Sequence, residues 1–170
     1  MEGVRKMDTF EDVIKANQIF ASTFTSEDLT GTAVKGLAIV TCMDSRIDPL
    51  RIVGMTSGDA KILRNAGARV TDDVLRTLVL ATHLLGVNRV LVMPHTDCRM
   101  ASTDEAGIHE EISQKSGVDT RSLDFQTTID QLDSLLKDIV KIESYPLLHD
   151  EVRVMGAIYD VKSGLFAPII

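Results

Sequence analysis

Short apolar runs alternate along this chain with longer stretches in which apolar residues recur at helical spacing. Four runs rich in β-branched residues are predicted strands, at 37–41, 60–63, 90–93 and 152–159, and a fifth edge strand is expected at 165–170. Strands that alternate with helices are typical of a mostly parallel sheet covered by helices. The runs 37–41 and 90–93 are short and apolar, as central strands are. We therefore expect an α/β fold, a mostly parallel central sheet of four to five strands flanked by helices, with an N-terminal helix.

Two internal helices are predicted from their apolar stripes. Thr71 before Asp72 and Asp73 is an N-cap followed by acids that suit the positive end of a helix, and Gly86 ends that helix. The stripes expected in the core are Val74, Leu75, Leu78, Val79, Thr82 and Leu85 in this helix and Ile129, Leu132, Leu135, Leu136, Ile139 and Val140 in a later one.

The N-terminal segment 8–23 is also predicted to be a helix. It carries Phe10, Val13, Ile14 and Phe20, and we expect it to pack on the domain or on a second subunit. No internal repeat or long linker interrupts the chain. Its 170 residues are therefore expected to form a single domain, 1–170.

The charge balance bears on the partners of the protein. The chain has 18 basic and 25 acidic residues, a net charge of −7, and its Lys and Arg are scattered. We therefore expect no nucleic acid and no membrane surface as a partner. The first twelve residues mix charges without the apolar core of a signal peptide, and no later run has the length of a membrane span. We expect a cytoplasmic protein, and two cysteines suit a reducing compartment.

Two cysteines and one histidine stand where predicted strands end. Cys42 follows the run 37–41, and His95 and Cys98 follow the run 90–93. Zinc favours thiolate and imidazole ligands, and catalytic sites typically leave one position to water. Ligand sites of open parallel sheets gather beyond the carboxyl ends of the strands. If the chain turns into a helix there, His95 and Cys98 face the same side. We interpret the three as an open, catalytic zinc site, the alternative being that the cysteines are small buried hydrophobes.

Asp44 and Arg46 accompany the first cysteine. In an extended chain, residues 42, 44 and 46 share one side, so that a thiolate, a carboxylate and a guanidinium can point into the same crevice. The alternative is a structural ion pair in a loop.

Three motifs together resemble the β-class carbonic anhydrases. They are Cys42-Met43-Asp44-Ser45-Arg46, Arg64-Asn65-Ala66-Gly67 and His95-Thr96-Asp97-Cys98, in this order over most of the chain. The short chain is most similar to the compact bacterial and archaeal branch. The resemblance implies an enzyme, a carbonate dehydratase, in which Cys42, His95 and Cys98 hold Zn²⁺ and zinc-bound hydroxide hydrates carbon dioxide reversibly to bicarbonate.

The resemblance also implies roles for other residues. Asp44 and Arg46 would form the family's dyad, whose aspartate either accepts a hydrogen bond from the hydroxide or swings onto the metal. Asn65, Ala66 and Gly67 would shape the substrate pocket, although the sequence alone favours an ordinary strand-to-helix turn for them. A homodimer or higher homo-oligomer is implied as well.

One position departs from the family pattern. Arg99 follows the second cysteine, where glycine is usual, and this implies either an ordinary helical backbone or strain. We expect Arg99 to pair with Asp104 or Glu105 at the surface, or else to reach the pocket mouth and alter the substrate. Relatives on the same fold hydrolyse carbonyl sulfide or carbon disulfide. A non-catalytic zinc protein that binds bicarbonate is a further alternative.

Overall fold

A parallel sheet with one antiparallel edge strand organises the protein. The computed structural model describes residues 8–25 and 29–169. The strands are β1 (Leu37–Cys42), β2 (Ala60–Asn65), β3 (Arg89–Met93), β4 (Arg153–Tyr159) and β5 (Phe166–Pro168), in the spatial order β2-β1-β3-β4-β5. Strands β1 to β4 are parallel and β5 pairs with β4 antiparallel. The expected α/β fold is confirmed, with β1 and β3 in the interior of the sheet as predicted.

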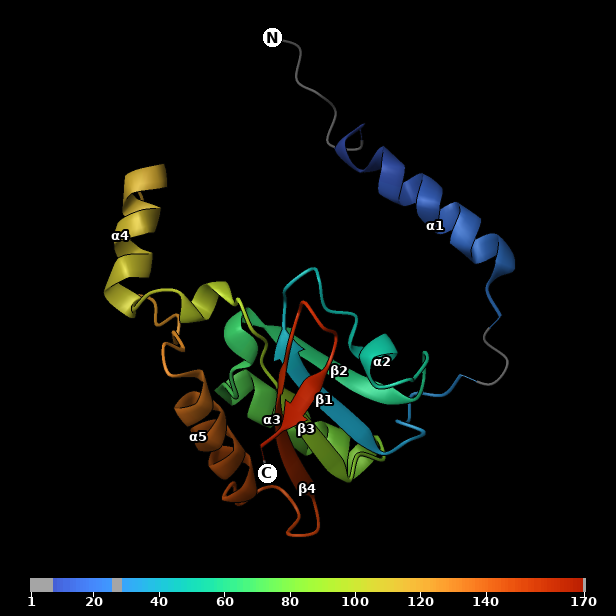
Figure 1. The fold of residues 1–170 in the computed structure, drawn as a ribbon. Coiled ribbons are helices and arrows are strands. Elements are labelled where there is room, and N and C mark those ends of the chain that lie inside the picture. The colour runs from blue at the N-terminus through green and yellow to red at the C-terminus, as the bar shows by residue number, and fades with distance from the viewer. Residues whose placement is uncertain (1–7, 26–28, 170) are drawn as a thin grey trace.

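Helices lie between the strands in chain order, and one more precedes β1 (Figure 1). They are α1 (Glu11–Thr23), α2 (Pro49–Ile52), α3 (Asp72–Leu84), α4 (Glu105–Ser116) and α5 (Gln131–Glu143), with single 3-10 turns η1 (Asp8–Phe10), η2 (Ala66–Ala68) and η3 (Arg99–Ala101). Thr71 caps α3 as expected, because its hydroxyl accepts the backbone N–H of Val74. The sequence pattern did not reveal α2 or α4. The first is only one turn long, and the second has few apolar residues and buries Ile108 alone.

Alternate residues of each strand enter two separate cores, because successive side chains point to opposite faces of a sheet. On one face Ala38, Val40, Val90 and Val92 pack against the buried residues of α3 and α5. On the other face Leu37, Ile39, Leu91 and Met93 pack with Ile47, Met100 and the two cysteines. This second core lies under the short α2 and the loops at the strand ends.

The predicted core face of α5 is wrong in part. Leu135 and Ile139 are buried, but Ile129, Leu132 and Val140 are exposed, and Asp138 and Ile142 are buried in their place. The buried face of α5 is thus displaced around the helix from the predicted one, because Asp138 lies on the buried side and forms an ion pair with Arg69. In α3, Val74, Leu75 and Leu78 are buried as predicted, together with Ala81, whereas Val79, Thr82 and Leu85 are half-buried.

The N-terminal helix α1 stands away from the rest of the molecule (Figure 1). It buries none of its residues. Phe10, Val13, Ile14, Phe20 and Phe24 are all exposed by between 42% and 58%. We expected this helix to pack on its own domain or on a second subunit, and the first of these expectations is wrong. Among the described residues, no helix is long and apolar enough to cross a membrane.

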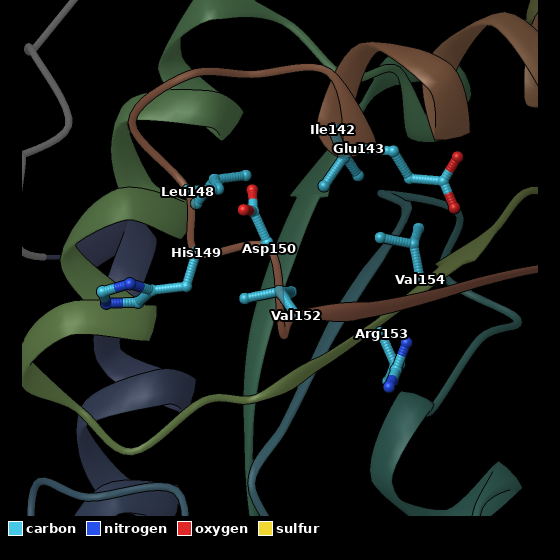
Figure 2. Close-up of a pocket in the computed structure, with 8 residues that line it drawn as sticks. All are labelled: Ile142, Glu143, Leu148, His149, Asp150, Val152, Arg153 and Val154. Carbon is cyan, nitrogen blue, oxygen red and sulfur yellow. The ribbon is translucent and has the colours of Figure 1, made fainter.

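A hollow of about 420 Å³ opens where the strands begin. Figure 2 shows Glu143, Asp150 and Arg153 around it, with the ring of His149 turned away. Arg153 is the first residue of β4, so the hollow lies at the opposite edge of the sheet from the ends of β1 and β3. Ligand sites of open parallel sheets gather at the carboxyl edge.

Candidate metal centre

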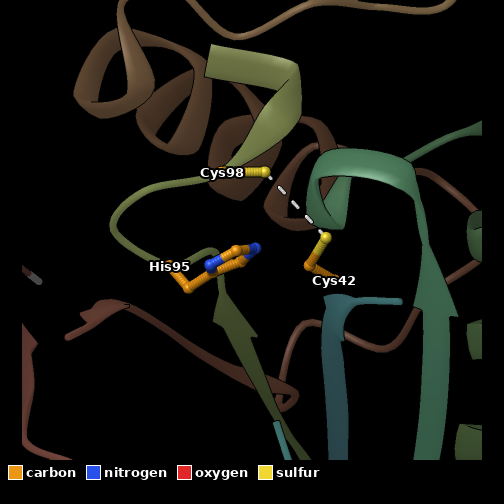
Figure 3. Close-up of side chains that lie close together, drawn as sticks. All are labelled: Cys42, His95 and Cys98. Carbon is orange, nitrogen blue, oxygen red and sulfur yellow. Dashed lines mark hydrogen bonds between the residues drawn. The ribbon is translucent and has the colours of Figure 1, made fainter. Parts of the chain in front are cut away.

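The ends of β1 and β3 bring together Cys42, His95 and Cys98. Thr41 is paired with Met93 in the sheet, so both strands end at the same level. Cys42 is the last residue of β1, and His95 is held beside Tyr159 by an isolated bridge to the end of β4. All three residues are buried. Figure 3 shows the two thiols and the imidazole pointing toward one another.

Their spacing suits one metal ion. The sulfur atoms of Cys42 and Cys98 are 4.0 Å apart, and one ligand atom from each of the three residues lies within 4.8 Å of the others. A tetrahedral zinc ion with Zn–S bonds of about 2.3 Å would separate two sulfurs by about 3.8 Å. Among the described residues, this is the one group of three or more such side chains close enough to hold a metal.

The imidazole of His95 is oriented by the backbone. Its Nδ1 lies 2.8 Å from the carbonyl oxygen of Thr96 and donates to it, which leaves Nε2 as the acceptor. Nε2 is fully buried and has no hydrogen-bond partner among the described residues. A buried nitrogen lone pair beside two thiols is costly without a partner, and a metal ion would supply one. The donor set therefore fits a metal.

The backbone between His95 and Cys98 corrects the expected helical arrangement. No helix begins at His95. Residues 95–98 form a turn in which Asp97 has a φ of +57°, and the 3-10 turn η3 starts only at Arg99. The two ligands converge because the left-handed residue reverses the chain between them.

The electrostatics of the two thiols are unequal. The hydrogen bond from Cys98 lowers the pKa of Cys42 to about 4, and His95 and the backbone N–H groups of Gly67 and Asp44 act in the same direction. The pKa of Cys98 is raised because its thiol donates to Cys42 and is buried. Burial alone would lower the pKa of His95, but the nearby charge of Cys42 and the hydrogen bond to the carbonyl of Thr96 outweigh it, so that the pKa is raised. A bound dication would favour the thiolate form of both cysteines.

Asp44 and Arg46 form a bidentate ion pair beside the triad. Arg46 Nε donates to Asp44 Oδ1 at 2.9 Å and Arg46 Nη2 donates to Oδ2 at 2.8 Å. This hydrogen bonding lowers the pKa of Asp44, whose Oδ2 lies 3.8 Å from Nε2 of His95. The expected extended strand from 42 to 46 is wrong, because Ser45 and Arg46 are in a turn. The turn brings the two charges together by letting the backbone N–H of Arg46 donate to Asp44 Oδ1.

The segment that starts at Arg64 lies alongside the first ligand. The guanidinium of Arg64 donates to the carbonyl oxygens of Cys42 and Asp44, at 2.9 and 2.6 Å. The side chain of Asn65 closes a turn: its amide nitrogen donates to the carbonyl oxygen of Arg69, and its amide oxygen accepts the backbone N–H of Arg69. Gly67 has a φ of +78°, and a Cβ there would meet the side chain of Met100 at 3.2 Å. Glycine is therefore required where the loop carrying Asn65, Ala66 and Gly67 passes Cys42.

Comparisons with known proteins agree with this geometry. A family model described as carbonic anhydrase matches residues 37–119. Beta-carbonic anhydrase 1 of Mycobacterium tuberculosis is 31% identical over 158 residues, which cover 93% of this chain and 96% of that protein. The solved structure of carbonic anhydrase from Streptococcus mutans is 38% identical, with a TM-score of 0.88 over 95% of this chain and 97% of that chain. The chain belongs to the β-carbonic anhydrase family.

The chain is also similar to proteins that are named for a different reaction. A carbon disulfide hydrolase of Acidithiobacillus thiooxidans is 27% identical over 153 residues, covering 78% of this chain and 76% of that protein. Membership of the β-carbonic anhydrase family is therefore compatible with more than one linear substrate.

The position after the second cysteine, usually glycine in β-carbonic anhydrases, is accommodated here without strain. Arg99 starts η3 and its φ is not positive; the left-handed residue of this turn is Asp97. The expected pairing of Arg99 with Asp104 or Glu105 is wrong. Its guanidinium pairs with Glu111 in α4 and donates to the hydroxyl of Ser102 at 3.0 Å. The surface interpretation holds, with a different carboxylate.

Several residues around the β-carbonic anhydrase site were not predicted from the sequence. Gln131 donates to the carbonyl oxygen of His95 at 2.8 Å, and Arg69 forms a bidentate pair with Asp138 below the Gly67 loop. Asp97 binds the free edge of Arg46. Of these residues, Asp97 alone lies in one of the three sequence motifs; the others come from distant segments that the fold brings together.

Proposed function

We propose that the protein is a zinc-dependent carbonate dehydratase that interconverts carbon dioxide and bicarbonate. The observation that supports this most strongly is the fully buried Nε2 of His95, which has no hydrogen-bond partner in the described part of the chain, faces two thiols and lies 3.8 Å from a carboxylate oxygen of Asp44. A structural zinc site would take all four ligands from the protein. Three ligands with a fixed carboxylate beside them suit a site that activates water.

Cys42, His95 and Cys98 would hold the zinc. When bound, zinc supplies a nucleophile at neutral pH because it lowers the pKa of coordinated water. The ionised carboxylate of Asp44 would accept a hydrogen bond from that nucleophile and so orient it toward the substrate. Arg46 keeps the carboxylate charged and in place through the bidentate pair.

The loop of Asn65, Ala66 and Gly67 would form one wall of the substrate pocket. Its support is the position of the loop: Asn65 is paired with Cys42 across β1 and β2, and the backbone N–H of Gly67 helps to lower the pKa of the Cys42 thiol. The wall would be rigid, because the side chain of Asn65 closes the turn from both ends.

A homodimer or higher homo-oligomer is part of the proposal. The exposed apolar residues of α1 lie at helical spacing, and the described residues of the chain bury none of them. A helix that exposes several large apolar side chains is stabilised by burial against another surface. A second copy of the chain would provide that surface. We place the protein in the cytoplasm, since its two cysteines are free and have a role as thiolates.

Carbon disulfide or carbonyl sulfide hydrolysis is the second candidate, supported by the similarity to the hydrolase of Acidithiobacillus thiooxidans. A bicarbonate-binding protein without turnover is the third. The intact pair of Asp44 and Arg46 favours turnover over binding alone.

Parallel assays on zinc-loaded and metal-free protein separate these candidates. Stopped-flow measurement follows the proton that is released when carbon dioxide and water form bicarbonate, and a sulfide assay follows the hydrolysis of carbon disulfide. We expect zinc-dependent hydration of carbon dioxide, with little sulfide released. Sulfide release without hydration would move the hydrolase to first place, and neither reaction at full zinc content would favour the binding protein.

A further inference from the structure

We propose that Asp97 is a positioning residue that fixes Arg46, and through it the carboxylate of Asp44. This inference rests on the proposed function, because it assigns a role within the same site. Arg46 Nη1 donates to Asp97 Oδ2 at 2.7 Å, and Arg46 Nη2 donates to the backbone carbonyl of Asp97 at 3.0 Å. The guanidinium is thus held on one edge by Asp44 and on another by Asp97.

The protein contains an internal reference for the effect of the second carboxylate. Asp119 and Arg121 repeat the Asp-x-Arg arrangement far from the metal centre: Arg121 donates to Asp119 through its backbone N–H, Nε and Nη2, at 3.1, 2.9 and 2.7 Å. The corresponding distances from Arg46 to Asp44 are 2.9, 2.9 and 2.8 Å. The local pair therefore forms without a metal centre.

The difference between the two pairs lies on the far edge of the guanidinium. Within the described residues Arg121 hydrogen-bonds only to Asp119 and is 79% exposed, whereas Arg46 is 43% exposed and has two further bonds to Asp97. A single exposed ion pair of this kind has a small interaction free energy and by itself holds an arginine side chain only weakly. Four side-chain bonds to one guanidinium restrict its rotation in a way that two do not.

The backbone at Asp97 supports a specific role. Its φ of +57° is a conformation that residues other than glycine seldom adopt, and it lies between two metal ligands. This conformation lets one residue present both its carboxylate and its carbonyl oxygen to Arg46. The result ties the loop of Cys42 to the loop of His95 and Cys98 through one side chain.

Two substitutions weaken the side-chain contact to Arg46 without straining the backbone. Asp97→Gly deletes the side chain at a position where glycine is at ease, and Asp97→Asn keeps the shape but removes the charge, since asparagine also tolerates positive φ. Asp119→Asn is the matched control, because it removes one carboxylate from an arginine elsewhere. All variants are compared as zinc-loaded protein with equal zinc content.

The first readout is rotation of the guanidinium group about its Nε–Cζ bond, measured by NMR. We expect Arg46 to rotate more slowly than Arg121 in the wild type, and to approach the rate of Arg121 in Asp97→Gly. The second readout is carbon dioxide hydration. We expect kcat to fall by about tenfold in both Asp97 variants with KM little changed, as for other residues that support a metal site, and no change in Asp119→Asn.

Equal rotation rates in wild type and Asp97→Gly would overturn the positioning role, and so would an unchanged kcat. An inactive wild type would instead refute the proposed function. The NMR comparison would then still decide whether Asp97 fixes Arg46, so the two failures are distinguishable.

Discussion

At the scale of single residues, the environment of His95 makes three side chains into one site. The carbonyl of Thr96 holds one ring nitrogen, Gln131 holds the backbone carbonyl, and the remaining nitrogen faces Cys42 and Cys98. Each contact removes a freedom that the imidazole would have in a loop. The site is therefore preformed by hydrogen bonds of the protein.

Removing one thiol should abolish tight metal binding. We expect Cys98→Ser to lose most of its zinc after dialysis against a chelator, because a serine hydroxyl is a poor replacement for a thiolate. Metal analysis per chain measures this directly. His109→Ala is the control, since His109 bonds Thr120 away from the centre and should leave one zinc per chain. Full zinc content in Cys98→Ser would contradict the assigned ligand set.

Two thiolates also predict the pH dependence of the reaction. They cancel the formal charge of the zinc dication, so its bound water should be less acidic than in a three-histidine site, where the pKa is about 7. Hydration should therefore rise into the mildly alkaline range. A profile that is flat from about pH 6 upward would contradict this assignment.

At the scale of elements, the loops at the carboxyl ends depend on α4 and α5. The pair of Arg69 and Asp138, 2.7 Å apart and largely buried, fastens the Gly67 loop to α5. Asp138 also accepts the backbone N–H of Val70. The carboxylate of Glu105, in the first turn of α4, accepts the backbone N–H groups of Phe125 and Thr127.

Breaking the buried pair should be costly. Asp138→Asn leaves the guanidinium of Arg69 without a counter-charge, and we expect the free energy of unfolding to fall by about 3 kcal/mol. Urea denaturation measures the change. Asp133→Asn, on the same helix, removes the partner of Lys137 in an exposed pair and should change stability by less than about 0.5 kcal/mol. Equal losses in the two variants would refute the structural role of the buried pair.

Glu105 should make stability depend on pH in the acid range. Burial raises the pKa of this carboxyl, but the two backbone N–H bonds outweigh burial, so the pKa is lowered in the folded protein. A lowered pKa adds stability above the unfolded value of about 4.3, and this stability is lost as pH falls through the folded value. Since the carboxylate is one-third exposed, we expect Glu105→Gln to lose about 1 kcal/mol at pH 7 and nothing near pH 3. A loss that is independent of pH would count against this assignment.

How far the sequence predicts the molecule depends on the kind of signal. Cys42, His95 and Cys98 were predictable because their chemistry is specific and strand ends gather at one edge. The buried face of α5 was mispredicted because Asp138 is buried in an ion pair with Arg69, which is distant in the sequence. Apolar periodicity cannot reveal such a partner. Asp97 was passed over because a left-handed backbone at an aspartate leaves no mark in hydrophobic patterning.

At the scale of the whole molecule, α1 is the element that the single chain leaves without a partner. Its apolar residues Val13, Ile14 and Phe20 fall on one side at 100° per residue, and Ile19 falls on the opposite side. Figure 1 shows the helix well separated from the sheet. An assembly of two or more chains would cover it.

Charge on the apolar side of α1 should break that assembly. We expect Phe20→Asp to shift the protein toward the monomer in light scattering, because it places a carboxylate in the proposed interface. Ile19→Asp makes a similar change on the opposite side and should leave the mass unchanged. A wild type that is monomeric at assay concentrations would contradict the proposed oligomer.

The most direct test of the account is the stopped-flow rate of carbon dioxide hydration by zinc-loaded wild type, Asp44→Ala and Asp119→Ala between about pH 7 and pH 9. The two variants lose the aspartate of the same local motif, one beside the metal centre and one far from it. The account predicts a zinc-dependent rate that rises with pH, is largely lost in Asp44→Ala and is retained in Asp119→Ala. Equal rates in the two variants, or no rate above the metal-free protein at any pH, would contradict it.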